Sequence, residues 1–293
     1  MDAKFQPAVS ALKSDDVDRL RKLVREDPSL ATSRSTTSHP TLLQCLVLDR
    51  KNSFARVEMA IILIDAGADL DGPLIACASC DNVEVAALLL DRGAAMNGNG
   101  GWSPLEEALY WNSQGVKALL LERGASIHNL RIAAGLGRTD LTASFFDTDG
   151  NLKAEAGNIN WPWGGIEEAE RSNFTRQGKD KLISTIRSWA NDRQDIINNA
   201  FVYACMHSQI DAAKLLLNKG AQIDAIPGGF DYSGTALHYA ALNGHQTMVQ
   251  FLCEQGADPR IKDTKVAGTP AGWAEYGGHP EIKSYLEQPF EGR

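Results

Sequence analysis

The chain has 293 residues, 43% of them hydrophobic, and its formal net charge of -8 corresponds to an isoelectric point near 5.3. This composition can form a large core, whereas the acidic balance argues against a general nucleic-acid binder. No apolar run approaches the roughly 18 residues of a membrane span. The first five residues lack the features of a signal peptide, and five cysteines do not suggest a disulfide framework. We therefore expect a cytoplasmic protein that binds neither membranes nor nucleic acid.

The N-terminal residues predict a capping unit over 1–38. Val17, Leu20 and Val24 fall at helical spacing, and Asp27-Pro28 ends the helix they form. The face opposite these apolar residues is polar, as the end of a stacked repeat array requires.

Similar helix pairs follow over residues 41–146, with unit starts at 41, 72, 103 and 128. Ser103-Pro104 is typical of a helix start, because serine caps the first amides and proline suits the first helical position. New units begin only four or five residues after the closing glycines Gly67 and Gly124. These short steps leave no room for the projecting hairpin between repeats.

The register breaks between 147 and 195, since the next recognisable unit starts near Asn199, 71 residues after 128. The run from Trp161 to Gly165, Trp-Pro-Trp-Gly-Gly, is typical of a loop, whereas residues 182–189 favour a helix. We favour an irregular insertion followed by one extra helix, in which Trp161 and Trp163 attach the segment to the repeats. A degenerate repeat remains the alternative.

Residues 196–288 contain the clearest unit, from Gly234 to Asp258. Thr235 is placed to cap its first helix, and Gly244 and Gly256 end its two helices. The residues between Ala225 and Ser233 predict a long finger loop, and the unit from 269 onward predicts a C-terminal cap.

The pattern Thr-x-Leu-His-x-Ala-Ala-x-x-Gly-His, from Thr235 to His245, resembles the ankyrin repeat, whose period is about 33 residues. The resemblance covers most of 8–146 and 196–288. It implies an all-α solenoid of stacked helix-turn-helix units, spanning 1–293 as one domain. It also implies that His238 makes structural hydrogen bonds, and that the protein is a non-enzymatic scaffold binding a partner protein through its concave face and finger loops.

Catalytic and metal motifs are weak. Cys77 and Cys80 form a Cys-x-x-Cys, but a structural zinc site needs four ligands and no second pair lies at suitable spacing. No Gly-x-Ser-x-Gly is present. We therefore expect no enzyme activity, no metal and no cofactor. A hydrolase using His207 with nearby acids is a remote alternative.

The candidate binding residues come from the positions that face the groove in the repeat geometry, together with the finger loop. Aromatic residues and methionine are the types that anchor interfaces. The residues selected are Trp102, Tyr110, Trp111, Met206, His207, Tyr232, Leu242, Asn243 and Tyr276. We predict that a monomer binds another protein here. The alternative is a small molecule or carbohydrate in a pocket between the groove and the 147–195 insertion.

Overall fold

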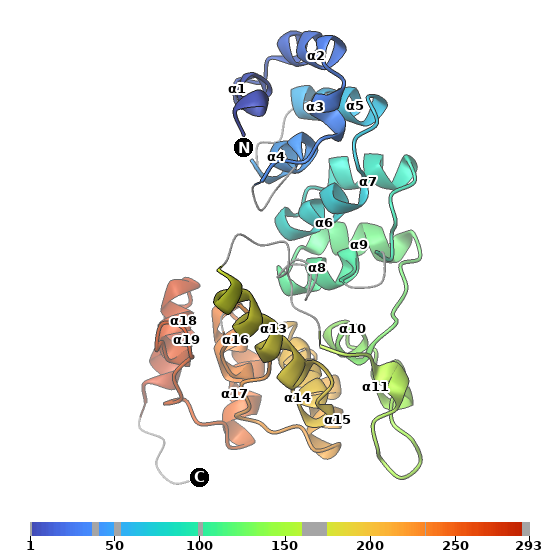
Figure 1. Ribbon diagram of the computed structural model, residues 1–293. Coiled ribbons are helices and arrows are strands. Elements are labelled where there is room, and N and C mark those ends of the chain that lie inside the picture. The colour runs from blue at the N-terminus through green and yellow to red at the C-terminus, as the bar shows by residue number, and fades with distance from the viewer. Residues whose placement is uncertain are drawn as a thin grey trace. The chain divides into compact units, whose positions relative to one another are not determined.

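The computed structural model describes residues 2–36, 41–49, 54–98, 102–159, 175–231 and 233–288. Among these residues the regular elements are helices, and β-pairing is limited to an isolated bridge between Phe146 and Leu152. The chain forms two compact units, Met1–Ser126 and Ile127–Arg293 (Figure 1). Each of these units is a stack of helix pairs.

The first unit contains two layers of helices. The helices α1, α4, α6 and α8 contact one another in that order, and α2, α5, α7 and α9 do the same in the second layer. Their bounds are α1 (Gln6–Lys13), α2 (Val17–Glu26), α3 (Ser29–Thr32), α4 (Leu42–Leu48), α5 (Phe54–Asp65), α6 (Asp71–Cys80), α7 (Val83–Asp91), α8 (Pro104–Tyr110) and α9 (Gln114–Glu122), after a 3-10 turn at Ala3–Phe5.

Local sequence signals set where these helices begin and end. Thr41 and Ser103 each form a capping box with the residue three places on, Gln44 and Glu106. Such a box satisfies amides that have no partner within the helix. The closing Gly124 has a φ of +86°, a left-handed conformation that favours glycine.

Side-chain acceptors hold neighbouring repeats in register. Asp81, at the end of α6, accepts from the backbone amides of Gly115 and Val116 in α9, at 3.2 and 2.7 Å. Asn97 accepts from the amide of Ser126 at 2.8 Å. Charged acceptors of backbone amides make stronger hydrogen bonds than neutral ones, so these contacts fix how one helix pair lies on the next.

The second unit repeats this arrangement. Helices α10, α14, α16 and α18 contact one another in order, and α11 packs against α15. The bounds are α10 (Leu130–Gly135), α11 (Thr139–Ser144), α13 (Arg176–Ala190), α14 (Arg193–Met206), α15 (Ile210–Asn218), α16 (Ala236–Leu242), α17 (Gln246–Glu254), α18 (Pro270–Tyr276) and α19 (Pro280–Leu286), with a 3-10 turn at Ala154–Ala156.

Two repeat starts differ from the sequence expectation. Asn129, rather than the residue before it, caps α10 by accepting from Ile132 N at 3.0 Å. The helix α14 begins at Arg193, because Asp192 caps it and no helix breaker follows. Asn199 therefore lies inside α14, and its side-chain amide donates to the carbonyl of Gly228 in the finger loop at 2.9 Å.

The segment 147–195 is described in part. After the bridge at Phe146 and Leu152, the chain forms the 3-10 turn and later α13, which packs on α14. Trp161 and Trp163 lie outside the described residues, so the choice between an insertion and a degenerate repeat stays a prediction.

His238 has the structural role that the sequence implied. Its Nδ1 lies 3.1 Å from Thr235 N and 2.9 Å from the Thr235 hydroxyl, while Nε2 lies 3.1 Å from the carbonyl of Gly268. Burial lowers the pKa of His238, which favours the neutral imidazole. The ring thus links one repeat to the loop that leads into the next.

Candidate functional site

The first unit gathers three aromatic side chains around the end of α8. Trp102 precedes the cap residue of α8, Tyr110 ends the helix and Trp111 follows it. The Tyr110 ring lies 6.2 Å from Trp102 and 5.2 Å from Trp111, both edge to face. Trp102 and Tyr110 are buried, whereas Trp111 is 44% exposed. Trp111 is therefore the member of this cluster that a binding partner can reach.

Glu107 lies beneath the two tryptophans and was not among the residues selected from sequence. Its Oε2 accepts from Trp102 Nε1 at 2.5 Å, and its Oε1 accepts from Trp111 Nε1 at 2.9 Å. Burial raises the pKa of Glu107 to about 7, partly offset by the two indole hydrogen bonds. A buried carboxyl group thus holds both indole rings in place.

The sequence spacing of Glu107 could have indicated its contact with Trp111. It stands four residues before Trp111 in a helix that ends between them, so the two side chains share one helix face. The five-residue separation from Trp102 spans a loop and a helix cap, and sequence spacing alone does not fix that contact.

In the second unit the finger loop occupies the face of the inner helices. The Phe230 ring lies 5.4 Å from Tyr203 of α14 and 4.9 Å from Tyr239 of α16, and Tyr239 lies 5.1 Å from Trp273 of α18. All four side chains are buried. The finger therefore packs onto α14 and α16 as part of the core of this unit.

The other selected residues of this unit have mixed exposure. Met206 and His207 are buried, which contradicts the expectation that they lie on an open surface; they end α14, where His245 Nε2 contacts the carbonyl of Met206 at 2.9 Å. Leu242 and Asn243 are half-buried. Tyr276, at the end of α18, is 90% exposed. Tyr232 lies outside the described residues.

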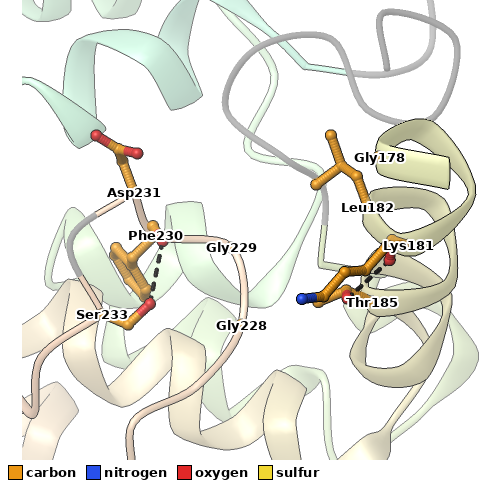
Figure 2. A pocket seen from close by; sticks show the side chains of 9 residues that line it. All are labelled: Gly178, Lys181, Leu182, Thr185, Gly228, Gly229, Phe230, Asp231 and Ser233. Atoms are coloured by element: carbon orange, nitrogen blue, oxygen red, sulfur yellow. Dashed lines mark hydrogen bonds between the residues drawn. The ribbon is translucent and has the colours of Figure 1, made fainter. Parts of the chain in front are cut away.

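A depression of about 370 Å³ lies between α13 and the finger loop, lined by Gly178, Lys181, Leu182, Thr185, Gly228, Gly229, Phe230, Asp231 and Ser233. Figure 2 shows the Lys181 ammonium extending from α13 toward the finger. Asp231 forms an ion pair with Lys265 at 2.8 Å. The lining combines glycine backbone and two apolar side chains with two hydroxyl groups, one ammonium and one carboxylate.

The cysteines are suited to packing. Cys77 and Cys205 are buried, and burial raises the pKa of both thiols well above the ordinary value, which disfavours the reactive thiolate. Within the described ranges, no three His, Cys, Asp or Glu side chains lie close enough to hold a metal ion. In the same ranges every helix is too short or too polar to span a bilayer.

Comparison with known proteins gives matches within the repeat region. The palmitoyltransferase Hip14 of Drosophila melanogaster is 38% identical over 102 residues, which is 34% of this chain and 13% of that protein. Human palmitoyltransferase ZDHHC17 is 39% identical over 61 residues, covering 21% and 9%. Human ZDHHC13 is 38% identical over 61 residues, covering 21% and 10%. The chain thus spans only about a tenth of the length of these relatives.

The family model for ankyrin repeats in three copies matches residues 38–130 and 177–263. These ranges include helices α4 to α9 in the first unit and α14 to α17 with nearly all of α13 in the second, and the described helices stack as such repeats do. The predicted all-α repeat fold is therefore confirmed. The chain belongs to the ankyrin repeat family.

Proposed function

We propose that this chain is a non-enzymatic scaffold that binds another protein through the inner-helix faces and finger loops of its repeats. Stacked repeats present extended surfaces suited to macromolecular partners. The observation that carries the proposal is Trp111, which is 44% exposed and whose indole donates to the buried Glu107.

Trp111 has the properties of an interface anchor. Tryptophan is enriched among the residues that contribute most to binding, and such anchors act best when they are already ordered. The hydrogen bond to Glu107 and the edge contact with Tyr110 restrict the Trp111 rotamer before any partner arrives. Tyr276, exposed at the end of α18, is the corresponding anchor that we propose in the second unit.

The matches to palmitoyltransferases enter this proposal only through the repeats. The matched stretches cover 61 to 102 residues and about a tenth of each relative. We propose that the chain shares with them a repeat surface for binding proteins, and not the transferase activity in their names. Fold alone does not identify a partner.

Affinity capture from extracts of the native host tests the proposal. Proteins retained by the wild-type chain are quantified against Trp111→Ala and Tyr276→Ala. Leu121→Ala is the matched control, because Leu121 is an apolar residue, 37% exposed, on α9 in the other helix layer. Truncating an anchor typically costs 2 kcal/mol or more, so we expect about a thirtyfold loss of partner affinity. A partner retained equally by all variants contradicts the proposal.

The depression beside α13 favours a second candidate, a small polar ligand or carbohydrate. Its volume of about 370 Å³ falls within the usual range for ligand sites. A panel of sugars and small anions, screened by ligand-observed NMR, should then give binding that Lys181→Met abolishes and Trp111→Ala preserves. If no compound in this screen binds in a way that Lys181→Met abolishes, this candidate function is ruled out.

We also propose that the chain is a monomer, and that it is cytoplasmic, as its composition suggested. Light scattering on the purified chain should give a mass near 31.8 kDa. A mass twice as large would show a dimer and contradict the proposed monomer.

A further inference from the structure

We propose that Trp111 and Glu107 form a recognition site for a basic side chain, an arginine guanidinium or a lysine ammonium, presented by the partner protein. This inference rests on the proposed function and deepens it, because it names the chemistry of the partner group that the surface takes.

The first step is the charge of Glu107. Both of its carboxyl oxygens accept hydrogen bonds from neutral indole donors, those of Trp102 and Trp111. Glu107 is 4% exposed, and an ionised carboxylate at such a depth is stable only when it is hydrogen-bonded and compensated. Two neutral donors supply the hydrogen bonds but no opposite charge.

The helices packed on α8 do not supply that charge either. Helix α8 contacts α6 and α9, whose charged residues are Asp71, Lys117 and Glu122. Lys117 donates a hydrogen bond to the side chain of Gln114, and the negative charge that acts on its ammonium is that of Asp81. The charge that acts on Glu107 comes from Glu106, which is also acidic and raises the pKa of Glu107 further. Neither α6 nor α9 therefore provides a cation that acts on an ionised Glu107.

The second step is access. Of the two residues that donate to Glu107, Trp111 is the one that reaches solvent, with 44% exposure. An aromatic face attracts a cation through the ring quadrupole, and arginine in particular stacks on indole. Donation of the Trp111 N–H to a carboxylate polarises the indole, so the ring face becomes a better platform for a cation. Ring and carboxylate thus favour the same kind of ligand.

The third step is selectivity. A cation on the Trp111 face interacts with the negative charge of Glu107 across a poorly hydrated protein interior, where such interactions are stronger than in water. A neutral ligand gains the ring contact alone and leaves Glu107 uncompensated. Binding of the cation and ionisation of Glu107 therefore promote each other, and thermodynamic linkage makes the effect reciprocal.

The test is an NMR titration of the full chain with a small arginine probe. The indole N–H signals of Trp102 and Trp111, assigned with single Trp→Phe variants, report the protonation of Glu107. Without probe they should titrate near pH 7. Saturating N-acetyl-arginine amide should lower this midpoint by about one pH unit, equivalent to a tenfold preference for the ionised form. N-acetyl-citrulline amide, a neutral molecule of the same shape, should leave the midpoint unchanged.

Variants provide a second measurement. Glu107→Gln keeps an acceptor for an indole and removes the charge, so at pH 8 it should weaken binding of the arginine probe about tenfold and leave the citrulline probe unaffected. Leu121→Ala should change neither. If Glu107→Gln does not fold, the wild-type titration decides by itself.

The inference is overturned if arginine and citrulline bind equally, or if arginine leaves the Glu107 midpoint in place. In that case a partner still captured through Trp111 would leave the proposed function standing. Partner capture that is unchanged in Trp111→Ala would instead remove the proposed function, whatever the probes show.

Discussion

Phe230 tests whether the finger loop is part of the core of the second unit. Exposed loop residues usually tolerate substitution, since loops lie at the surface. Phe230 instead lies in the loop between α15 and α16 with 2% exposure, against the rings of Tyr203 and Tyr239. We expect Phe230→Ala to destabilise the protein as a core substitution does.

The magnitude follows from the contacts that are lost. Removing a buried phenylalanine side chain costs about 3–5 kcal/mol, including the cavity left behind. The two ring contacts, at 5.4 and 4.9 Å, contribute roughly 0.5–1.5 kcal/mol each beyond area burial. The loop can relax into part of the space, so we expect about 3 kcal/mol. For a unit of this size that lowers the melting temperature by about 6–12 °C.

Urea and thermal unfolding followed by circular dichroism measure this effect. The control is Phe54→Ala, the same substitution at a side chain that is 98% exposed at the start of α5. It should change the free energy of unfolding by less than about 0.5 kcal/mol. Repeat arrays can unfold in more than one step. The transition that Phe230→Ala shifts should therefore coincide with the change in tryptophan fluorescence from the second unit.

Equal effects of Phe230→Ala and Phe54→Ala would refute this reasoning. A cost below about 1 kcal/mol for Phe230→Ala would mean that the finger does not pack on α14 and α16 in solution. The rings of Tyr203 and Tyr239 would then be accessible to solvent.

Three further predictions concern conformation and protonation. Gly256 has a φ of +94°, so Gly256→Ala should destabilise the protein by about 1 kcal/mol in urea unfolding. Gly272→Ala, at an exposed position inside α18, should instead stabilise it by up to about 1 kcal/mol, and stability changes in the same direction would contradict the assignment of Gly256 to a helix end. The pKa of Glu107 is raised from 4.5 to about 7, so the cost of ionising it in the folded protein is absent below pH 4.5 and complete above pH 7. The stability of Glu107→Gln relative to wild type should therefore rise by about 3 kcal/mol across that window, and a difference that does not change with pH would exclude the raised pKa. Burial lowers the pKa of His238 below its ordinary 6.5, so the unfolded chain takes up a proton first and the free energy of unfolding should fall as the pH drops below 6.5. His238→Gln should reduce this pH dependence in unfolding curves recorded from pH 7.5 to 5, and an unchanged pH dependence would assign it to another group.

The sequence by itself determined the fold family and helix starts such as those capped by Thr41 and Ser103. Capping residues such as Thr41 and Ser103, and closing glycines such as Gly124, act through the backbone within one or two turns. Their effect is local, and so a linear pattern contains it. The structural role of His238 was implied by the resemblance to ankyrin repeats, and its contacts with Thr235 and Gly268 agree with it.

Tertiary structure alone decided which side chains of the groove positions are open. Trp102, Tyr110, Met206 and His207 occupy positions that face the inner surface, yet all four are buried, while Trp111 and Tyr276 remain exposed. Repeat periodicity gives the direction of a side chain from its helix, but it does not say what lies above it. What covers a side chain depends on segments distant in sequence, as the finger shows by bringing Phe230 onto Tyr203 of α14 and Tyr239 of α16.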